Sequence, residues 1–163
     1  MLVIESVRVE TLSEQHAAVV RGRRPPEEIG EFVGPAYAAV SAALAEQGVA
    51  IAGPPFCRYA AGEGEMTAEG HAEVFSMAVG FPTERAIEPA GDVEPMTFPA
   101  GDAVVVVHVG AYPELGEAYA AGAGWMREHY LEMSSDPWET YLDGPDADPH
   151  RTVLRFPCRP AAT

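Results

Sequence analysis

The sequence predicts an α+β fold in which a strand–helix–strand–strand unit occurs twice. The two copies would form an antiparallel sheet of about eight strands with two main helices and a central groove. Three matched pairs of segments support this duplication. They are "HAAVVRG" with "DAVVVVHVG", "PEEIGEFVGPAYAAVSAAL" with "YPELGEAYAAGAGWMREHY", and "PPFCRYAAG" with "DPWETYLDG". The duplication predicts one domain, residues 1–163, with halves at about 3–80 and 93–160.

The first helix follows the first β-branched run. Its apolar residues recur at helical spacing, at Ile29, Phe32, Val33, Tyr37, Val40 and Leu44. Gly34-Pro35 interrupts this pattern. Because proline is tolerated in a first helical turn, we expect the main helix to begin at Pro35 and to end before Gly48.

The second helix begins near Pro113, and its inner stripe would consist of Leu115, Tyr119, Trp125, Met126 and His129. Gly122 and Gly124 each weaken a helix by about 1 kcal/mol relative to alanine. We therefore expect these glycines either to permit close packing or to leave room for a ligand.

The remaining strands lie beside segments rich in turn-forming residues, "GVAIAGPP", "EMSSDP" and Gly80 to Pro95. The segment "MTFPAGDAVVVV" reads as strand, turn and strand, which predicts a hairpin. By analogy, "VRVETLSEQHAAVV" predicts the matching hairpin in the first half.

The acidic composition argues against nucleic acids and anionic membranes as binding partners. The 163 residues include 25 acids against 10 Lys and Arg, a net charge of -15. Such a chain lacks the basic patch that nucleic acids and anionic membranes require. The longest apolar run, "AVVVVHVGAY", is too short for a membrane-spanning helix. The two cysteines, Cys57 and Cys158, form no disulfide framework, so we expect a cytoplasmic protein.

The short segment "DPWETYLDG" contains the residue of greatest interest. In the duplication Glu139 corresponds to Cys57, Tyr141 to Tyr59, and Trp138 to Phe56. Cysteine is among the most buried residue types, which predicts a buried Glu139 rather than a solvated glutamate in an edge strand. Strand alternation places Glu139 and Tyr141 on one face and Trp138 on the other.

A carboxylate among aromatic side chains suits an organic cation, through charge pairing and cation–π attraction. If burial raises its pKa, the same carboxylate could serve as a general base. His108 could contact a ligand or simply hydrogen-bond at the end of a buried strand. The candidate ligand-binding residues are Glu139, Tyr141, Trp125, Tyr112, Tyr37, Tyr59, Phe56, Trp138 and His108.

Patterns for other chemistries are missing from the sequence. The five histidines form no HxH or HExxH, so no metal is expected. "GEGEMTAEG" and "AGAGW" lack the remainder of a P-loop or a GxGxxG motif, and no GxSxG occurs. We therefore expect no cofactor.

The order "AVVVVHVGAYPELGEAY", "DPWETYLDGP" and "RTVLRFPCR" resembles the GyrI-like small-molecule-binding domains, from about Val7 to Pro160. These domains also occur as effector-binding domains of MerR-type and AraC-type multidrug regulators. The most specific matches are His108-x-Gly110-x-Tyr112 and Glu139-x-Tyr141 followed by Gly144-Pro145. The resemblance implies an eight-stranded antiparallel sheet with two helices, and a groove in which Glu139 meets cationic, lipophilic drugs.

The resemblance leaves three functions open. The first is a stand-alone multidrug-binding protein, because the residues before the first strand are too few for a helix-turn-helix. The second is a hydrolase that opens the ring of cyclopropanoid genotoxins, in which Glu139 activates water and Tyr112 steadies the carbonyl oxygen that gains charge. The third is an acidic inhibitor that binds a protein partner.

Overall fold

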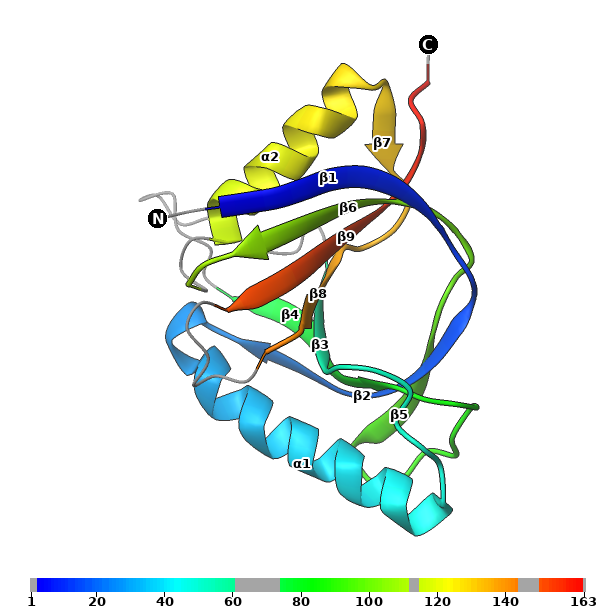
Figure 1. Ribbon diagram of the computed structural model, residues 1–163. Helices are drawn as coiled ribbons and strands as arrows, with labels where there is room; N and C mark the ends of the chain where they lie inside the picture. Colours follow the sequence, from blue (N-terminus) through cyan, green and yellow to red (C-terminus); the bar gives the residue numbers. More distant parts are fainter. Residues whose placement is uncertain (1–2, 61–73, 112–114, 144–149, 163) are drawn as a thin grey trace. The chain divides into compact units, whose positions relative to one another are not determined.

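The computed structural model describes residues 3–60, 74–111, 115–143 and 150–162. These residues contain nine strands, two α-helices and one short 3-10 helix (Figure 1), and the strands within each of the two units described below pair antiparallel. The α+β fold class is therefore confirmed. The chain forms two compact units, Glu14–Pro99 and the combination of Met1–Ser13 with Ala100–Thr163. Neither described helix is long and apolar enough to cross a membrane.

The unit Glu14–Pro99 has the strand order β3-β4-β2-β5. These strands are β2 (Gln15–Arg24), β3 (Phe56–Tyr59), β4 (Phe75–Pro82) and β5 (Val93–Phe98). The 3-10 helix η1 (Pro26–Glu28) leads directly into α1 (Ile29–Gln47), which packs on β2 and β4. The buried helix residues Ala36, Val40, Ala43 and Leu44 face this sheet.

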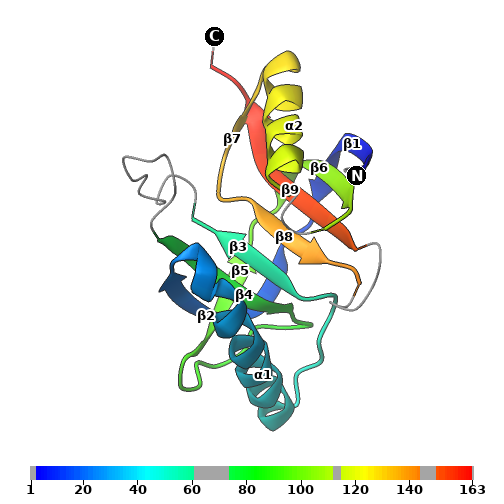
Figure 2. The same cartoon turned by 90° about the vertical axis from the view of Figure 1, so that its left-hand side faces the viewer.

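The other unit has the strand order β1-β6-β9-β8. Its strands are β1 (Val3–Leu12), β6 (Gly101–Val109), β8 (Trp138–Tyr141) and β9 (Arg151–Pro160). Helix α2 (Leu115–Glu128) packs on β6 and β9. Figure 2 shows the short strand β7 (Leu131–Met133) leading from the end of α2 and running beside the C-terminal part of β9. Two of its residues, Glu132 and Met133, belong to "EMSSDP", for which the sequence predicts turns rather than a strand.

The two units follow the same plan. Each contains strand, helix, strand and strand in chain order, β2-α1-β3-β4 in one and β6-α2-β8-β9 in the other. The four-residue strands β3 and β8 correspond, and Cys57 and Glu139 are the second residue of each. Cys57 is 1% exposed and Glu139 is 6% exposed. The burial predicted for Glu139 from this equivalence is confirmed.

The two predicted hairpins are wrong. Strand β1 pairs with β6, with Leu12 opposite Gly101, and β2 pairs with β5, with Gln15 opposite Phe98. The connection from β1 to β2 is Ser13-Glu14, and the connection from β5 to β6 is Pro99-Ala100. Two-residue hairpins favour Gly or Asn at positions of positive φ, and neither connection offers them. The first strand therefore joins the unit that contains the second half of the chain.

The predicted start of the first helix is also wrong, whereas its predicted end is confirmed. Helix α1 begins at Ile29 and continues through Pro35. Pro35 is exposed, so the carbonyl that loses its partner can be hydrated. The helix ends at Gln47, and Gly48 caps it with a φ of 65°. Glycine adopts this left-handed conformation without the steric cost that a side chain brings.

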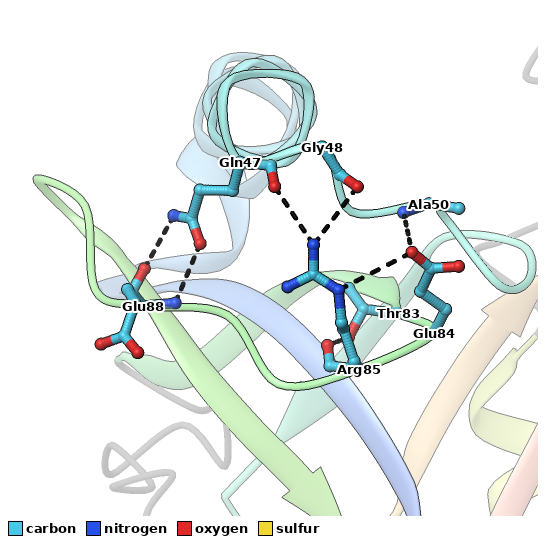
Figure 3. A network of polar contacts seen from close by, with 7 residues as sticks. All are labelled: Gln47, Gly48, Ala50, Thr83, Glu84, Arg85 and Glu88. Carbon is cyan, nitrogen blue, oxygen red and sulfur yellow. Dashed lines mark hydrogen bonds and ion pairs between the residues drawn. The ribbon is translucent and has the colours of Figure 1, made fainter.

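The C-terminal end of α1 is tied to the segment after β4 (Figure 3). Arg85 Nη2 donates to the carbonyl oxygens of Gln47 and Gly48, at 3.2 and 3.4 Å. The Gln47 side-chain amide forms two 2.9 Å hydrogen bonds with the backbone N–H and C=O of Glu88. Because α1 has no basic residue in its last turn, Arg85 supplies the positive charge that favours a helix C-terminus.

Helix α2 approaches its sheet closely because of Gly122. A Cβ at Gly122 would lie 2.6 Å from the ring of Phe156 on β9, whereas a Cβ at Gly124 would meet only the end of Arg127 at 3.7 Å. Close packing thus explains Gly122. The predicted inner stripe is wrong at His129, which is exposed and stacks on Trp125 with ring centroids 3.7 Å apart. His129 follows the last residue of the helix.

Candidate ligand-binding site around Glu139

The position of Glu139 follows from the register of β8 on β9. Glu139 lies opposite Leu154, and Leu154 belongs to the hydrophobic core between α2 and the sheet. The side chain of Glu139 therefore shares the helix-covered face. Trp138 lies opposite Arg155 on the other face of the sheet. The alternation predicted for these two neighbours is confirmed.

Two phenols hold the carboxylate of Glu139. Tyr119 Oη on α2 donates to Oε2 at 2.6 Å, and Tyr141 Oη on β8 donates to Oε1 at 2.7 Å. Each carboxylate oxygen thus accepts one short hydrogen bond. Hydrogen bonds to an ionised acceptor are shorter and stronger than neutral ones, so the two tyrosines fix the orientation of this group and favour its ionised form.

Tyr119 is itself fixed from two sides. Its ring meets the ring of Phe156 edge to face, with centroids 5.6 Å apart. Gly122 lies three residues later and allows α2 to approach that same ring. The small glycine and the large Phe156 therefore set the distance between helix and strand at which the hydroxyl of Tyr119 reaches Glu139.

Burial raises the pKa of Glu139 above its usual value, and the hydrogen bonds from Tyr119 and Tyr141 oppose this rise. Among the described residues, no Arg, Lys or His forms an ion pair with this carboxylate. Phenols supply hydrogen bonds but no positive charge. Within the described part of the chain, the ionised form of Glu139 is therefore buried without a counter-ion, which is costly in a folded protein.

His108 and Thr152 lie on the same sheet face as this carboxylate. Tyr141 is opposite Thr152, and Thr152 is opposite His108, so the three residues form one row across β8, β9 and β6. Both His108 and Thr152 are 0% exposed. Thr152 Oγ1 finds no hydrogen-bond partner among the residues described. A buried hydroxyl in this state costs about 1–3 kcal/mol.

Three of the predicted residues lie in the unit Glu14–Pro99. Tyr37 Oη donates to the carbonyl oxygen of Phe56 at 2.9 Å. Phe56 is 2% exposed and packs edge to face on Phe98, and Tyr59 meets Phe75 in the same geometry. These aromatic residues thus contact partners within their own unit, and of the three only Phe56 is fully buried. Their part in a common ligand site stays a prediction.

The other predicted residues differ in their relation to Glu139. Trp125 lies six residues beyond Tyr119 on α2, partly buried against the core of that unit. Trp138 is 6% exposed on the opposite sheet face. Tyr112 lies outside the described residues. Tyr119 was expected only as a packing residue, although a hydroxyl on an apolar helix stripe is a signal that it has a polar partner.

The arrangement does not resemble a metal centre. In the described parts of the chain, no group of three His, Cys, Asp or Glu side chains could hold a metal ion. What the site offers is one buried carboxylate and two phenols.

Comparison with known proteins identifies a family profile and a shared fold. The profile of the GyrI-like small-molecule-binding domain matches residues 5–159. No curated protein matches in sequence. The crystal structure of the EcmrR C-terminal domain is 18% identical with a TM-score of 0.78, covering 96% of this chain and 98% of that one.

Two further solved structures share the fold. A hydrolase encoded by lin2189 from Listeria innocua is 16% identical with a TM-score of 0.66, covering 94% of this chain and 91% of that one. SAV2435 bound to tetraphenylphosphonium is 13% identical with a TM-score of 0.59, covering 94% of both chains.

Proposed function

Because the chain belongs to the GyrI-like small-molecule-binding domain family, we propose that it binds lipophilic, cationic small molecules with Glu139 as their counter-ion. The observation that carries this proposal is the buried carboxylate of Glu139, held by two phenols and by no cation of the described chain.

The electrostatics favour a cationic ligand over a neutral one. A buried carboxylate raises the free energy of the folded state, and an opposite charge placed beside it compensates that cost. Tyr119 and Tyr141 hold the carboxylate in place before the ligand arrives, so binding need not order it. A lipophilic organic cation also loses little hydration on entering such a site. Tetraphenylphosphonium, the molecule bound to SAV2435, has this chemistry.

The proposed ligand contacts are Glu139 and Tyr141, which the sequence predicted, and Tyr119, which the structure places beside them. The other sequence-predicted residues, Trp125, Tyr112, Tyr37, Tyr59, Phe56, Trp138 and His108, are proposed as aromatic or polar contacts to be tested one at a time. An aromatic ring that stacks on the ligand contributes about 0.5–2 kcal/mol, so its substitution should on average weaken binding less than loss of the carboxylate charge.

The proposal is tested by titrating tetraphenylphosphonium into the wild type and into Glu139→Gln at neutral pH, with calorimetry as the readout. Glutamine keeps the shape and removes the charge. We expect the affinity to fall about tenfold to a hundredfold, the equivalent of about 1.4–3 kcal/mol. The matched control is Glu128→Gln, which removes an exposed acid from α2 and should leave the affinity unchanged. Equal affinities for wild type and Glu139→Gln would refute the counter-ion role.

A second candidate function is hydrolysis of a strained cyclopropane ring that is conjugated to a carbonyl group. The observation that favours it is the buried carboxyl of Glu139, whose raised pKa suits a general base. Glu139 would remove a proton from water as its oxygen attacks a ring carbon. The breaking C–C bond would pass its electron pair to the carbonyl oxygen, which the hydroxyl of Tyr112 would stabilise.

Mass spectrometry separates this second function from binding alone. A cyclopropane-bearing alkylator is incubated with the wild type, with Glu139→Gln and with buffer, and addition of water is followed over time. Catalysis requires the wild type to exceed both others. Equal rates for wild type and Glu139→Gln would remove the enzyme function for that substrate and leave the binding function standing.

A further inference from the structure

Arg155 on β9 lies on the sheet face opposite Glu139, and the site just described does not use it. The register aligns Arg8 with Val105, Val105 with Arg155, and Arg155 with Trp138. These four residues form one row across β1, β6, β9 and β8. Arg8 and Arg155 therefore flank Val105, which is 0% exposed.

The guanidinium of Arg155 is partly buried and has a neutral partner. Its Nη1 donates to Thr140 Oγ1 at 3.0 Å, and within the described chain it forms no ion pair. Burial lowers the pKa of Arg155 and the nearby charge of Arg8 lowers it further, while Glu10 acts in the opposite direction. Arg155 is half-buried, so the rest of its guanidinium remains accessible to a small ligand.

The charges around Arg155 add up to a local excess of positive charge. Glu10 forms an ion pair with Arg8, whose Nη2 lies 2.6 Å from Glu10 Oε1, and Arg8 Nη1 donates to Ser6. One carboxylate therefore faces two guanidinium groups. The chain as a whole carries a net charge of -15, which repels anions. A local excess of positive charge is therefore the kind of place on this protein where an anion could bind.

Charged side chains are rarely buried without a partner, and a guanidinium matches the geometry of a carboxylate or phosphate. Neighbouring strands are about 4.8 Å apart, so the backbones of Arg8 and Arg155 are separated by about 10 Å across β6. Two long side chains at this separation can converge on one small anion. We propose that Arg155, flanked by Arg8 and oriented by Thr140, is a binding site for a compact oxyanion, a carboxylate or a phosphate group.

The site is separate from that of Glu139 in both location and charge. Residues Trp138 and Thr140 of β8 face Arg155, whereas Glu139 and Tyr141 face α2. An oxyanion at Arg155 would approach from the side of Arg8, whose side chain is 49% exposed. The proposal does not depend on the function proposed for Glu139.

The test is thermal unfolding of the wild type in inorganic phosphate and in chloride at equal ionic strength. Specific binding should raise the Tm by about 3–5 °C at a phosphate concentration ten times the Kd. Acetate in place of phosphate shows whether a carboxylate is accepted. Chloride at the same ionic strength corrects for general screening.

Arg155→Met removes the charge and keeps an apolar side chain of similar length. We expect it to abolish the phosphate response and to change the stability in chloride little, because the loss of a partly buried charge offsets the loss of the hydrogen bond to Thr140. The control is Arg159→Gln on the same strand, which breaks an exposed ion pair with Glu132 and should keep the phosphate response. Binding of tetraphenylphosphonium should be unchanged in Arg155→Met.

A direct measurement does not depend on the folding of any variant. The Nε–Hε signal of Arg155 in a 15N NMR spectrum of the wild type should shift progressively with phosphate and saturate. A wild type that responds to phosphate no more than to chloride, in both Tm and this signal, would overturn the proposal. Retention of the full phosphate response by Arg155→Met would overturn it equally.

Discussion

Tyr119 on α2 donates a 2.6 Å hydrogen bond to Glu139 on β8, and so links the helix to the strand that carries the buried acid. Replacing Tyr119 with Phe would leave Oε2 of Glu139 without this donor. We expect Tyr119→Phe to lower the free energy of unfolding by about 1–3 kcal/mol at neutral pH, measured by urea denaturation.

The control for this prediction is Tyr130→Phe, since Tyr130 is 81% exposed. Tyr130→Phe removes only a solvated hydroxyl, so it should change the free energy of unfolding by less than about 0.5 kcal/mol. If both variants are equally stable, the bond between Tyr119 and Glu139 contributes nothing.

Glu139 should also make stability depend on pH. Its folded-state pKa is raised above the usual 4.5, so the folded state holds this proton at a pH where the unfolded state has released it. Stability therefore falls as the pH rises from about 4.5 through the folded pKa. Measured by urea denaturation at several pH values, the wild type should lose stability relative to Glu139→Gln across this window. A constant difference between the two would contradict the raised pKa.

The contact between Gly122 and Phe156 gives a matched pair of variants. Gly122→Ala places a methyl group 2.6 Å from the Phe156 ring, so the overlap should outweigh the gain in helix propensity and destabilise the fold by about 1–3 kcal/mol. Gly124→Ala meets nothing closer than 3.7 Å and should stabilise the protein by up to about 1 kcal/mol. Chemical denaturation of both variants checks this, and effects of the same sign would show that α2 does not pack as described.

Two buried threonines provide the next test. Thr152 Oγ1 has no hydrogen-bond partner in the described chain, whereas Thr140 Oγ1 accepts a hydrogen bond from Arg155. Valine has nearly the same shape without the hydroxyl. Thr152→Val should therefore leave the free energy of unfolding unchanged or raise it by about 1 kcal/mol, and Thr140→Val should lower it by about 1–3 kcal/mol. The reverse order in thermal or urea unfolding would contradict these assignments.

The sequence alone was sufficient to locate Glu139, because the duplication supplied a comparison within the chain. The equivalent Cys57 indicated burial, and strand alternation indicated which neighbour shares its face. The hydrogen bond from Tyr119 was not predictable in the same way. It depends on how far α2 stands from the sheet, and Gly122 against Phe156 sets that distance.

The pairing of β1 with β6 and of β2 with β5 was also not predictable from the sequence pattern. Alternation of apolar residues identifies a strand but carries no information about which strand it pairs with. The assumption that consecutive strands form hairpins failed at Ser13-Glu14 and at Pro99-Ala100, where the residues for a tight turn are missing. The start of α1 was not predictable from Pro35 for a similar reason. A helix can continue through an exposed proline when its other residues pack well, and the sequence pattern does not show how well they pack.

The most direct test of the central claim is the pKa of Glu139 itself, followed by 13C NMR of its side-chain carboxyl with and without saturating tetraphenylphosphonium. If Glu139 is the counter-ion, the bound cation compensates the buried charge, and the pKa should fall towards its ordinary value as the ligand binds. A pKa that is the same in the free and the saturated protein would contradict the claim, because the charge of Glu139 would then contribute nothing to binding.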